Sequence, residues 1–435
     1  MPDTYVTMQD VADDMLIAFQ NQLKVVNTAT QVFDKQFTNG HKDKGATLQV
    51  QRPNNNVVGD GATITTILDN SERYVNLTID QRKHVVLDFL TKDLTLYARQ
   101  DFFKRFIEPG AKALASVVDL AVADAMCKQA ANFVGTPGVA LSDESTIWAA
   151  RSLMNKLGMP YDERYAFISE DMYQNVGHGL KSLFQPALVK DIIEDAMIGR
   201  LSGFDFFSTI HTRNHLSGTG DTVAAPAAGF VTAGTIAVAT VSGDATLALT
   251  GILPSQTGVF KAGDKIYVDG VDVLGNPVYL VNPIDFTSTG KLACFEVTAD
   301  VNSTIGGTAT VPISIANTTI ITDDPHPYRN LTGNIEIGGQ VYLATARTGA
   351  GASVAKTYSV GMAYHPSSIL FAAPPLIMPK AIPDAAKGVQ TDPQTGISIR
   401  ILETYDSTYD KVLTRMDIIY GLTVLQDRCV AVLGA

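Results

Sequence analysis

The sequence from Leu90 to Gly135, LTKDLTLYARQDFFKRFIEPGAKALASVVDLAVADAMCKQAANFVG, decides the fold. From Phe103 onward its apolar residues recur at spacings of three and four, which predicts a helix with one apolar face. Pro109-Gly110 interrupts the pattern, because proline removes a backbone donor and crowds the preceding turn. We therefore expect either one kinked helix or two collinear helices, with Pro109 at the first position of the second. The part after Pro109 runs to Asn132 and spans about 35 Å, a length that indicates a structural backbone.

The composition is that of a large, folded and acidic chain. Its 435 residues allow two or three domains, and 46% hydrophobic with 18% charged residues is not the composition of a disordered protein. The net charge of −11 argues against a protein that reads DNA sequence, because such a protein needs a basic face. A surface that encloses nucleic acid without adhering to it is compatible with this charge.

Cysteine usage and the N-terminal residues indicate a soluble intracellular protein. Cys127, Cys294 and Cys429 are odd in number and far apart, so we expect reduced, buried thiols. The N-terminus has no basic segment before its apolar residues and does not resemble a signal peptide. The most apolar region, Gly229 to Leu253, alternates with Thr, Ser and Gly, which predicts strands and no membrane span.

The segments before the long helix predict a helix followed by a long hairpin. Residues 11–33 have helical spacing with acidic residues at the start. Residues 47–52 alternate as a strand that stops at Pro53, and further alternating runs cover 74–89. A polar loop joins the two strands. Because such a hairpin cannot form a core of its own, we expect it to lie against something else, most naturally a neighbouring subunit.

Strand signals dominate residues 222–322. Alternating runs recur roughly every eight to twelve residues between Gly, Asp and Pro, which predicts a small barrel or sandwich. Helical segments precede this region, and further strand-like runs follow it to the C-terminus. We therefore expect an inserted β domain.

No residue pattern predicts an active site. His211 and His215 are four apart, a spacing that on a helix would suit a metal, but the segment HTRNH lacks a third ligand and precedes a glycine-rich turn. Asp323-Asp324 beside His326 is better explained as a polar hinge than as a metal site. Complete phosphate loops and the GxSxG element of serine hydrolases are missing from the sequence. The chain is thus predicted to be neither an enzyme nor a cofactor-binding protein.

The C-terminal run from Ile399 to Gly434 carries two short elements at a specific distance. Glu403-Thr404-Tyr405-Asp406 forms a Glu-x-Tyr-Asp element, and an Arg-x-Asp-x-x-Tyr-Gly element runs from Arg415 to Gly421. Upstream of this run stand MAYHPSSILFAAPPLIMP at 362–379 and KAGDKIYVDGV at 261–271.

These blocks, together with the strand–loop–strand and helix of residues 45–119, resemble the major capsid proteins of tailed double-stranded DNA bacteriophages. The greatest resemblance is to the coat proteins of short-tailed Salmonella phages of the P22 kind. Two parts differ from that pattern: the inserted domain diverges beyond Val271, and Gln426 to Cys429 replace the usual acidic-aromatic ending.

The resemblance implies an α+β fold of the tailed-phage and herpesvirus major capsid type, with a long spine helix, an extension loop and an inserted all-β, barrel-like domain. The expected parts are an N-terminal helical arm (1–36), the extension-loop hairpin (37–90), the spine helix of the peripheral domain (91–135), an axial domain core (136–221 and 326–396), the inserted domain (222–325), and C-terminal strands that return to the peripheral domain (397–435).

The function implied by the resemblance is structural. Copies of the chain would assemble as pentamers and hexamers into an icosahedral capsid around a double-stranded DNA genome, within the host bacterial cytoplasm. The implied partners are other copies, a scaffolding protein, a portal at one vertex, and DNA held without sequence-specific binding, with no membrane.

Five charged residues are candidates for subunit interfaces. The candidates are Arg52 and Asp60 of the hairpin and Arg99, Lys104 and Arg105 of the helix. The three basic residues of the helix suit acidic loops of a neighbour, although a solvated helix face explains them equally well.

Two other classes of protein fit part of the pattern. A tail or decoration protein would share the Thr- and Gly-rich strands, but the long central helix favours a coat protein. An enzyme with an inserted β domain would need a convergent catalytic site, which the sequence does not supply.

Overall fold

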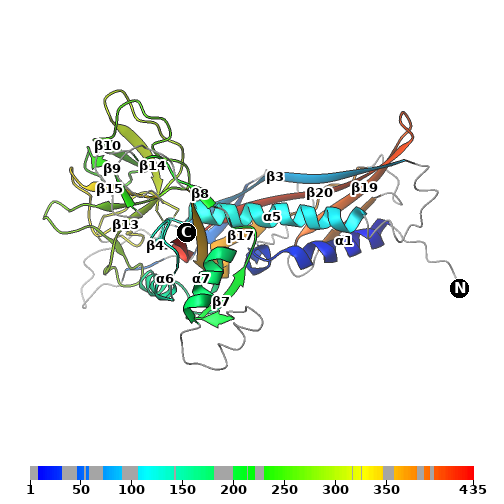
Figure 1. The fold of residues 1–435 in the computed structure, drawn as a ribbon, viewed down its shortest axis with the longest axis horizontal. Coiled ribbons are helices and arrows are strands. Elements are labelled where there is room, and N and C mark those ends of the chain that lie inside the picture. The colour runs from blue at the N-terminus through cyan, green and yellow to red at the C-terminus, as the bar shows by residue number, and fades with distance from the viewer. Residues whose placement is uncertain are drawn as a thin grey trace. The chain divides into compact units, whose positions relative to one another are not determined.

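The computed structural model divides the chain into two compact units, coloured along the chain in Figure 1. The first unit consists of Met1–Gln51, Tyr74–Ala123 and Ile369–Thr423, and the second of Arg52–Arg73, Asp124–Ser368 and Val424–Ala435. The structure describes residues 8–31, 47–52, 55–57, 72–90, 106–141, 144–180, 199–212, 214–220, 230–315, 317–324, 326–345, 357–379, 387–391 and 396–435.

Strand β20 (Lys411–Val424) organises the sheet of the first unit. It pairs antiparallel with β19 (Ser398–Asp406) and with β3 (Arg73–Leu90), the 18-residue second strand of the predicted hairpin. The other strands of this sheet are β1 (Thr30–Gln31), β2 (Thr47–Arg52), β17 (Ile369–Ala372) and β18 (Lys387–Thr391). β3 is bound to β20 of its own chain, and contact of the hairpin with a neighbouring subunit stays a prediction. Alternation predicts which face of a strand is apolar, not which strand it pairs with.

Two glycines mark the closest approaches between elements of the first unit. A Cβ atom on Gly421 would clash with the carbonyl oxygen of Thr78, where the register between β20 and β3 shifts. A Cβ atom on Gly110 would lie 2.5 Å from the terminal methyl of Met416. The predicted long helix, α5 (Glu108–Gln129), therefore packs directly on β20, as the sequence indicates for a spine helix.

Pro109 stands in the first turn of α5, which begins at Glu108. A proline is tolerated there, because the first amide groups of a helix have no intrahelical acceptor. Phe106 and Ile107 before α5 form a π turn, so the choice between one kinked helix and two collinear helices stays a prediction. Residues 91–105, the expected first half of the spine helix, lie outside the described residues.

Helix α1 (Met8–Gln22) ends earlier than the predicted 11–33. A short 3₁₀ turn over Val26–Thr28 follows it. The cause is a tertiary contact: the buried carboxylate of Asp119 on α5 accepts hydrogen bonds from the backbone N–H groups of Val25 and Val26, at 2.9 and 3.0 Å. Figure 1 shows α1 and α5 side by side. A side chain 94 residues away therefore redirects the backbone after α1.

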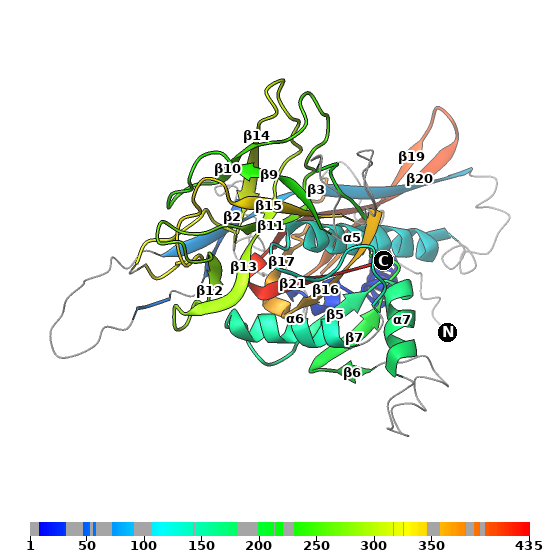
Figure 2. The same cartoon turned by 60° about the vertical axis from the view of Figure 1, so that its left-hand side comes forward.

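The second unit contains a mixed sheet with helices α6 (Ser145–Lys156) and α7 (Glu170–Leu180) beside it (Figure 2). Its strands are, in order, β4 (Phe133–Gly135), β21 (Cys429–Gly434), β16 (Thr357–Tyr364), β5 (Tyr165–Ile168), β7 (Phe204–Ser208) and β6 (Arg200–Leu201), with β8 (Asn214–Leu216) on β16. β21 pairs with β16 and β4, and the expected return of the C-terminal strands to the peripheral domain stays a prediction. All six residues of β21 are buried, because β21 is an inner strand with β16 on one side and β4 on the other. The apolar sequence of β21 did not indicate to which sheet it belongs.

Six strands of the second unit close into a barrel. They are β11 (Lys265–Asp269), β15 (Gln340–Ala344), β9 (Phe230–Ile236), β10 (Thr246–Thr250), β14 (Ala309–Ser314) and β13 (Ser288–Val297), with β12 (Tyr279–Val281) beside β13. β11 pairs with both β13 and β15, which closes the ring. The expected barrel-like domain is therefore present, but its strand β15 lies beyond residue 325, where the inserted domain was expected to end. Among the described residues, no helix is both long and apolar enough to span a membrane.

We predict that Gly421→Ala lowers the free energy of unfolding of the unassembled subunit by about 1–3 kcal/mol, because the new methyl group forces β20 away from β3. Urea unfolding measures the change. Gly306→Ala is the matched control, since the nearest atom to a Cβ there is 3.8 Å away. Equal effects of the two substitutions would contradict the assigned role of Gly421.

Candidate functional site: a buried polar junction

The predicted interface residues are only partly within the described chain. Arg52 ends β2, is buried, and forms an ion pair with Asp427 of the same chain. The other four candidates, Asp60, Arg99, Lys104 and Arg105, lie outside the described residues. Contact of these residues with neighbouring subunits stays a prediction.

The histidines of HTRNH lie in a turn and a strand, not on one helix face. His215 belongs to β8, and its Nε2 lies 2.7 Å from Oδ1 of the buried Asp264. His211 is buried in the preceding turn, where its backbone N–H donates to Thr209 Oγ1. Likewise Asp324 pairs with Arg329 at 2.8 Å. Each of these residues thus has a partner within the chain, and His215 lies in a strand where a loop was expected.

A serine, a histidine and an aspartate also meet near residue 365, but not as a catalytic triad. His365 Nδ1 is 2.7 Å from Ser367 Oγ and also accepts the Ser367 backbone N–H at 3.2 Å. Its Nε2 is 3.8 Å from the exposed Asp162, too far for a hydrogen bond. Burial lowers the pKa of His365, and the smaller effect of the nearby Asp162 carboxylate raises it. The group is a turn motif, stabilised by Arg428, which donates to Ser367 Oγ at 2.6 Å.

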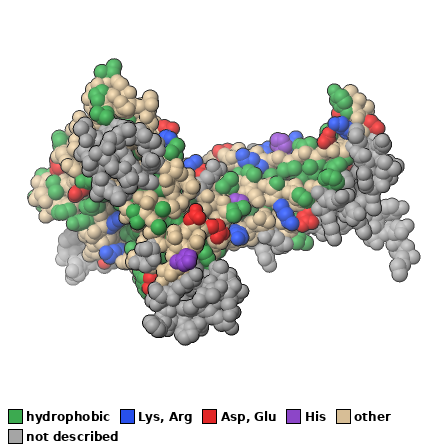
Figure 3. All heavy atoms as spheres, in the orientation of Figure 1, with side chains coloured by type: hydrophobic (Ala, Val, Ile, Leu, Met, Phe, Trp, Pro, Cys, Tyr) green, Lys and Arg blue, Asp and Glu red, His purple; other side chains and the backbone are tan. Residues whose placement is uncertain are grey.

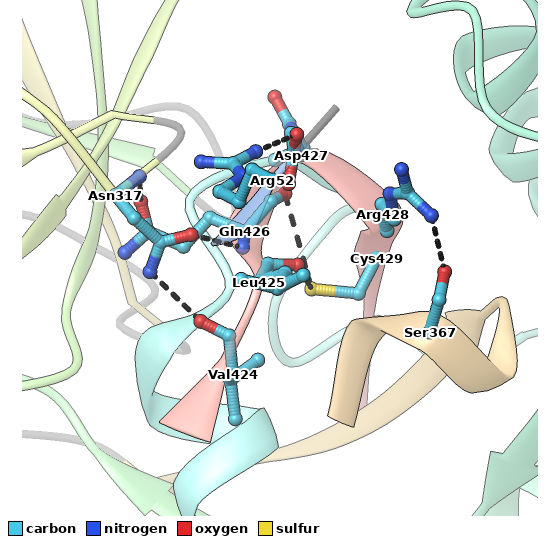
Figure 4. A network of polar contacts seen from close by, with 10 residues as sticks. Arg52, Asn317, Ser367, Val424, Leu425, Gln426, Asp427, Arg428 and Cys429 are labelled. Atoms are coloured by element: carbon cyan, nitrogen blue, oxygen red, sulfur yellow. Dashed lines mark hydrogen bonds and ion pairs between the residues drawn. The ribbon is translucent and has the colours of Figure 1, made fainter. Parts of the chain in front are cut away.

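The most densely connected polar residues surround the turn that leads from β20 into β21 (Figure 4). A 3₁₀ turn over Gln426–Arg428 makes this connection. Gln426 is only 2% exposed, although nothing in the local sequence marks it as buried. Its Oε1 accepts hydrogen bonds from the Ser314 hydroxyl (3.1 Å) and the Asn317 backbone N–H (2.9 Å), and its Nε2 donates to Glu296. One glutamine side chain thus joins the turn to β13 and β14 of the barrel.

Asn317 completes this connection from the barrel side. It has a φ of 58°, a left-handed conformation that asparagine tolerates better than most residues. Its Oδ1 accepts the Gln426 backbone N–H at 2.7 Å, and its Nδ2 donates to the Val424 carbonyl at 2.8 Å. Asn132, between α5 and β4, donates to the Gln426 carbonyl at 3.3 Å. We call Asn132, Glu296, Ser314, Asn317 and Gln426 the polar junction.

A buried lysine and a buried glutamate extend the polar junction into the barrel. Lys265 of β11 and Glu296 of β13 are direct cross-strand partners, and both are buried. Burial raises the pKa of Glu296 to about 7, while Lys265 and the hydrogen bond from Gln426 oppose the rise. Burial lowers the pKa of Lys265, with Glu296 as the main opposing charge. Lys265 Nζ also donates to the Lys128 carbonyl at the end of α5, where a helix favours a positive charge.

The arrangement of the polar junction is mechanical and not catalytic. Its groups hydrogen-bond to one another, and a buried network that is fully paired fixes the position of its members. Within the described residues, no cluster of three His, Cys, Asp or Glu side chains is placed to hold a metal ion. In the sequence, Gln426 to Cys429 stand out only by differing from the family's acidic-aromatic ending, and no pattern there indicates that Gln426 is the centre of a network.

Comparison with known proteins identifies relatives of the whole chain. The family model described as "P22 coat protein - gene protein 5" matches residues 9–433. No curated protein matches. Solved structures that are similar include one of Mycobacterium phage Che8 (12% identity, 94% of this chain and 90% of that chain, TM-score 0.45), the capsid of Ralstonia phage GP4 (7%, 96% and 90%, 0.44) and the mature capsid of bacteriophage PhiM1 (12%, 94% and 86%, 0.41).

We predict that Gln426→Ala lowers the free energy of unfolding by roughly 3 kcal/mol, because buried partners lose their hydrogen bonds. The loss should grow with pH. The Gln426 hydrogen bond lowers the pKa of Glu296, so its removal raises that pKa above about 7. At low pH the Glu296 carboxyl is protonated in both folded proteins. As the pH rises through about 7, ionising it costs the folded variant more free energy than the folded natural protein, so the difference in stability grows.

Urea unfolding at pH 5.5 and 8.5 checks this prediction. Gln256→Ala is the control, because the Gln256 side chain donates to the Pro254 carbonyl at an exposed site of the same barrel. A pH-independent loss for Gln426→Ala, or one no larger than that of the control, would show that the polar junction does not work as described.

Proposed function

Because the chain belongs to the P22 coat protein family, we propose that its extension-loop hairpin supplies contacts between neighbouring subunits. The protein is a major capsid protein: it is a non-enzymatic component of the virion, and copies of it form the icosahedral head of a phage. The single observation that carries this function is the family match over residues 9–433.

Two arginines support the proposal, because they hold the two ends of the extension loop. Arg52, the last residue of β2, is buried against Asp427. Arg73, the first residue of β3, places its guanidinium 4.2 Å from the ring centroid of Tyr328, in cation–π contact. Burial and the neighbouring Arg52 lower the pKa of Arg73, while Asp427 and Tyr328 oppose this.

A loop with fixed ends loses less conformational entropy when it binds a partner. This favours a direct contact of the loop, including Asp60, with the next subunit. Arg52 then acts by fixing the base of the loop. Arg99, Lys104 and Arg105 remain our further candidates for interfaces on the spine helix.

We also infer a scaffolding protein and a portal as partners during assembly. Family membership supports both. The net charge of −11 supports a shell that encloses double-stranded DNA without adhering to it.

We predict that deletion of Asn54 to Asn70 leaves a folded subunit that cannot form shells. Circular dichroism and urea unfolding measure the fold, and negative-stain electron microscopy measures the shells. A second variant replaces the same residues with an equal number of Gly and Ser residues. It separates the effect of the shorter loop from the effect of the lost side chains. Neither variant should assemble. Normal particles from either one would refute the proposed loop contact.

A further inference from the structure

Three arginines converge on one buried carboxylate in the first unit. Asp417 of β20 has a side chain that is 0% exposed. Its Oδ2 lies 2.6 Å from Nη2 of Arg400 on β19, and its Oδ1 lies 2.8 Å from Nε of Arg415. Arg82 of β3 places Nη2 3.7 Å from the same Oδ1. We call these four residues the arginine cluster.

Strand register explains why these residues meet. Asp417 pairs directly with Arg400 on one side and with His84 on the other, and directly paired residues share a face of a sheet. Met416, the next residue along, faces α5. The arginine cluster therefore lies on the face of the sheet opposite the spine helix.

The arginine cluster has more positive than negative charge. Three guanidinium groups face one carboxylate. Among the described residues, each of the three arginines forms its ion pair with Asp417. Burial alone would raise the pKa of Asp417, but hydrogen bonds from Arg400 and Arg415 lower it, so this carboxylate is charged at neutral pH. Two formal positive charges are left over.

One donor at the floor of the cluster also lacks an acceptor. The Arg400 side chain is 8% exposed; its Nη1 donates to the Ile377 carbonyl at 2.6 Å and its Nη2 to Asp417. Its Nε is buried without a hydrogen-bond partner among the described residues. A buried donor of this kind, beside unbalanced positive charge, points to an anionic ligand.

The outer side of the cluster is open to such a ligand. The Arg82 and Arg415 side chains are 48% and 39% exposed. Arg415 contacts Asp417 through Nε, and its terminal nitrogens have no hydrogen bond to another described residue. The fork of a guanidinium matches a carboxylate with two parallel hydrogen bonds. We propose that Arg82 and Arg415 bind an Asp or Glu side chain of a second copy of this chain, an inference that rests on the capsid function.

Charge favours a second copy over DNA as the source of the anion. Each copy carries 44 acidic and 33 basic residues, so a neighbouring subunit presents many carboxylates. Figure 3 shows charges of both signs scattered over the described surface of the face it draws.

Assembly of a charge-neutralised variant tests the proposal. The double variant Arg82→Gln/Arg415→Gln should raise the subunit concentration needed for shell formation about tenfold or more, as expected for a lost charged contact. Light scattering and electron microscopy measure shell formation. Lys411→Gln is the matched control, because it removes one positive charge from the same strand but from a separate pair with Asp88. It should assemble like the natural protein.

A second variant identifies the partner and does not depend on a loss of assembly. Arg82→Lys keeps the positive charge and allows a carbodiimide to join the new amine to a carboxylate in direct contact. Shells made from mixed ¹⁴N- and ¹⁵N-labelled subunits, without DNA, should yield a mixed-isotope cross-link from position 82 to an Asp or Glu residue.

Three results would overturn the carboxylate site. They are cross-links only within one chain or none at all, normal assembly of the double variant, and an effect seen only in DNA-filled particles, which would identify phosphate as the ligand. Each of them leaves the family-based capsid function intact, because shells would still form from the natural protein.

Discussion

The burial of Gln426 is the constraint on which the second unit depends. A primary amide in a water-free position needs partners for its oxygen and nitrogen, because an unpaired buried polar group costs about 1–3 kcal/mol. Those partners come from Ser314, Asn317 and Glu296, all of the barrel, while Gln426 itself leads into β21 of the mixed sheet. Apolar packing alone would tolerate small displacements of the turn against the barrel. Hydrogen bonds with fixed directions do not, so the polar junction specifies one arrangement.

The cross-strand pair of Lys265 and Glu296 shows how the barrel is tied to the rest of its unit. An isolated buried pair of this kind adds little net stability, because desolvation offsets the attraction between the charges. Here each member has a second partner: Lys265 donates to the last turn of α5, and Glu296 accepts from Gln426. The pair thus connects a helix end, two barrel strands and the turn before β21. An inserted domain joined to its host only by two linkers would move independently, whereas this barrel is held through buried polar contacts.

Local sequence patterns predicted the helices and strands whose formation depends on neighbouring residues in the sequence. The spacing of apolar residues after Pro109 predicted α5, and alternation predicted β2, β3 and an inserted barrel. Errors arose where a distant residue decides the outcome. Asp119 ends the α1 region by binding Val25 and Val26, and β15 joins the barrel after a long stretch without strands. The polar junction had no signal at all, since Gln426 resembles a surface residue until its three partners are known.

The Arg-x-Asp-x-x-Tyr-Gly element shows what a short motif of a coat protein can encode. Asp417 is the shared counter-ion of strands β3, β19 and β20, and Arg415 reaches it from the same strand. Tyr420 is fully buried and stacks on Phe371 of β17, at 5.7 Å between ring centroids. Gly421 leaves room for the Thr78 carbonyl at the register shift. Three of these positions meet neighbouring strands of β20, and Arg415 meets Asp417 within it, so the motif is a set of packing requirements on one strand. Of the four, only Arg415 reaches the surface. In an assembling shell, this arginine can therefore bind a neighbouring subunit as well as Asp417.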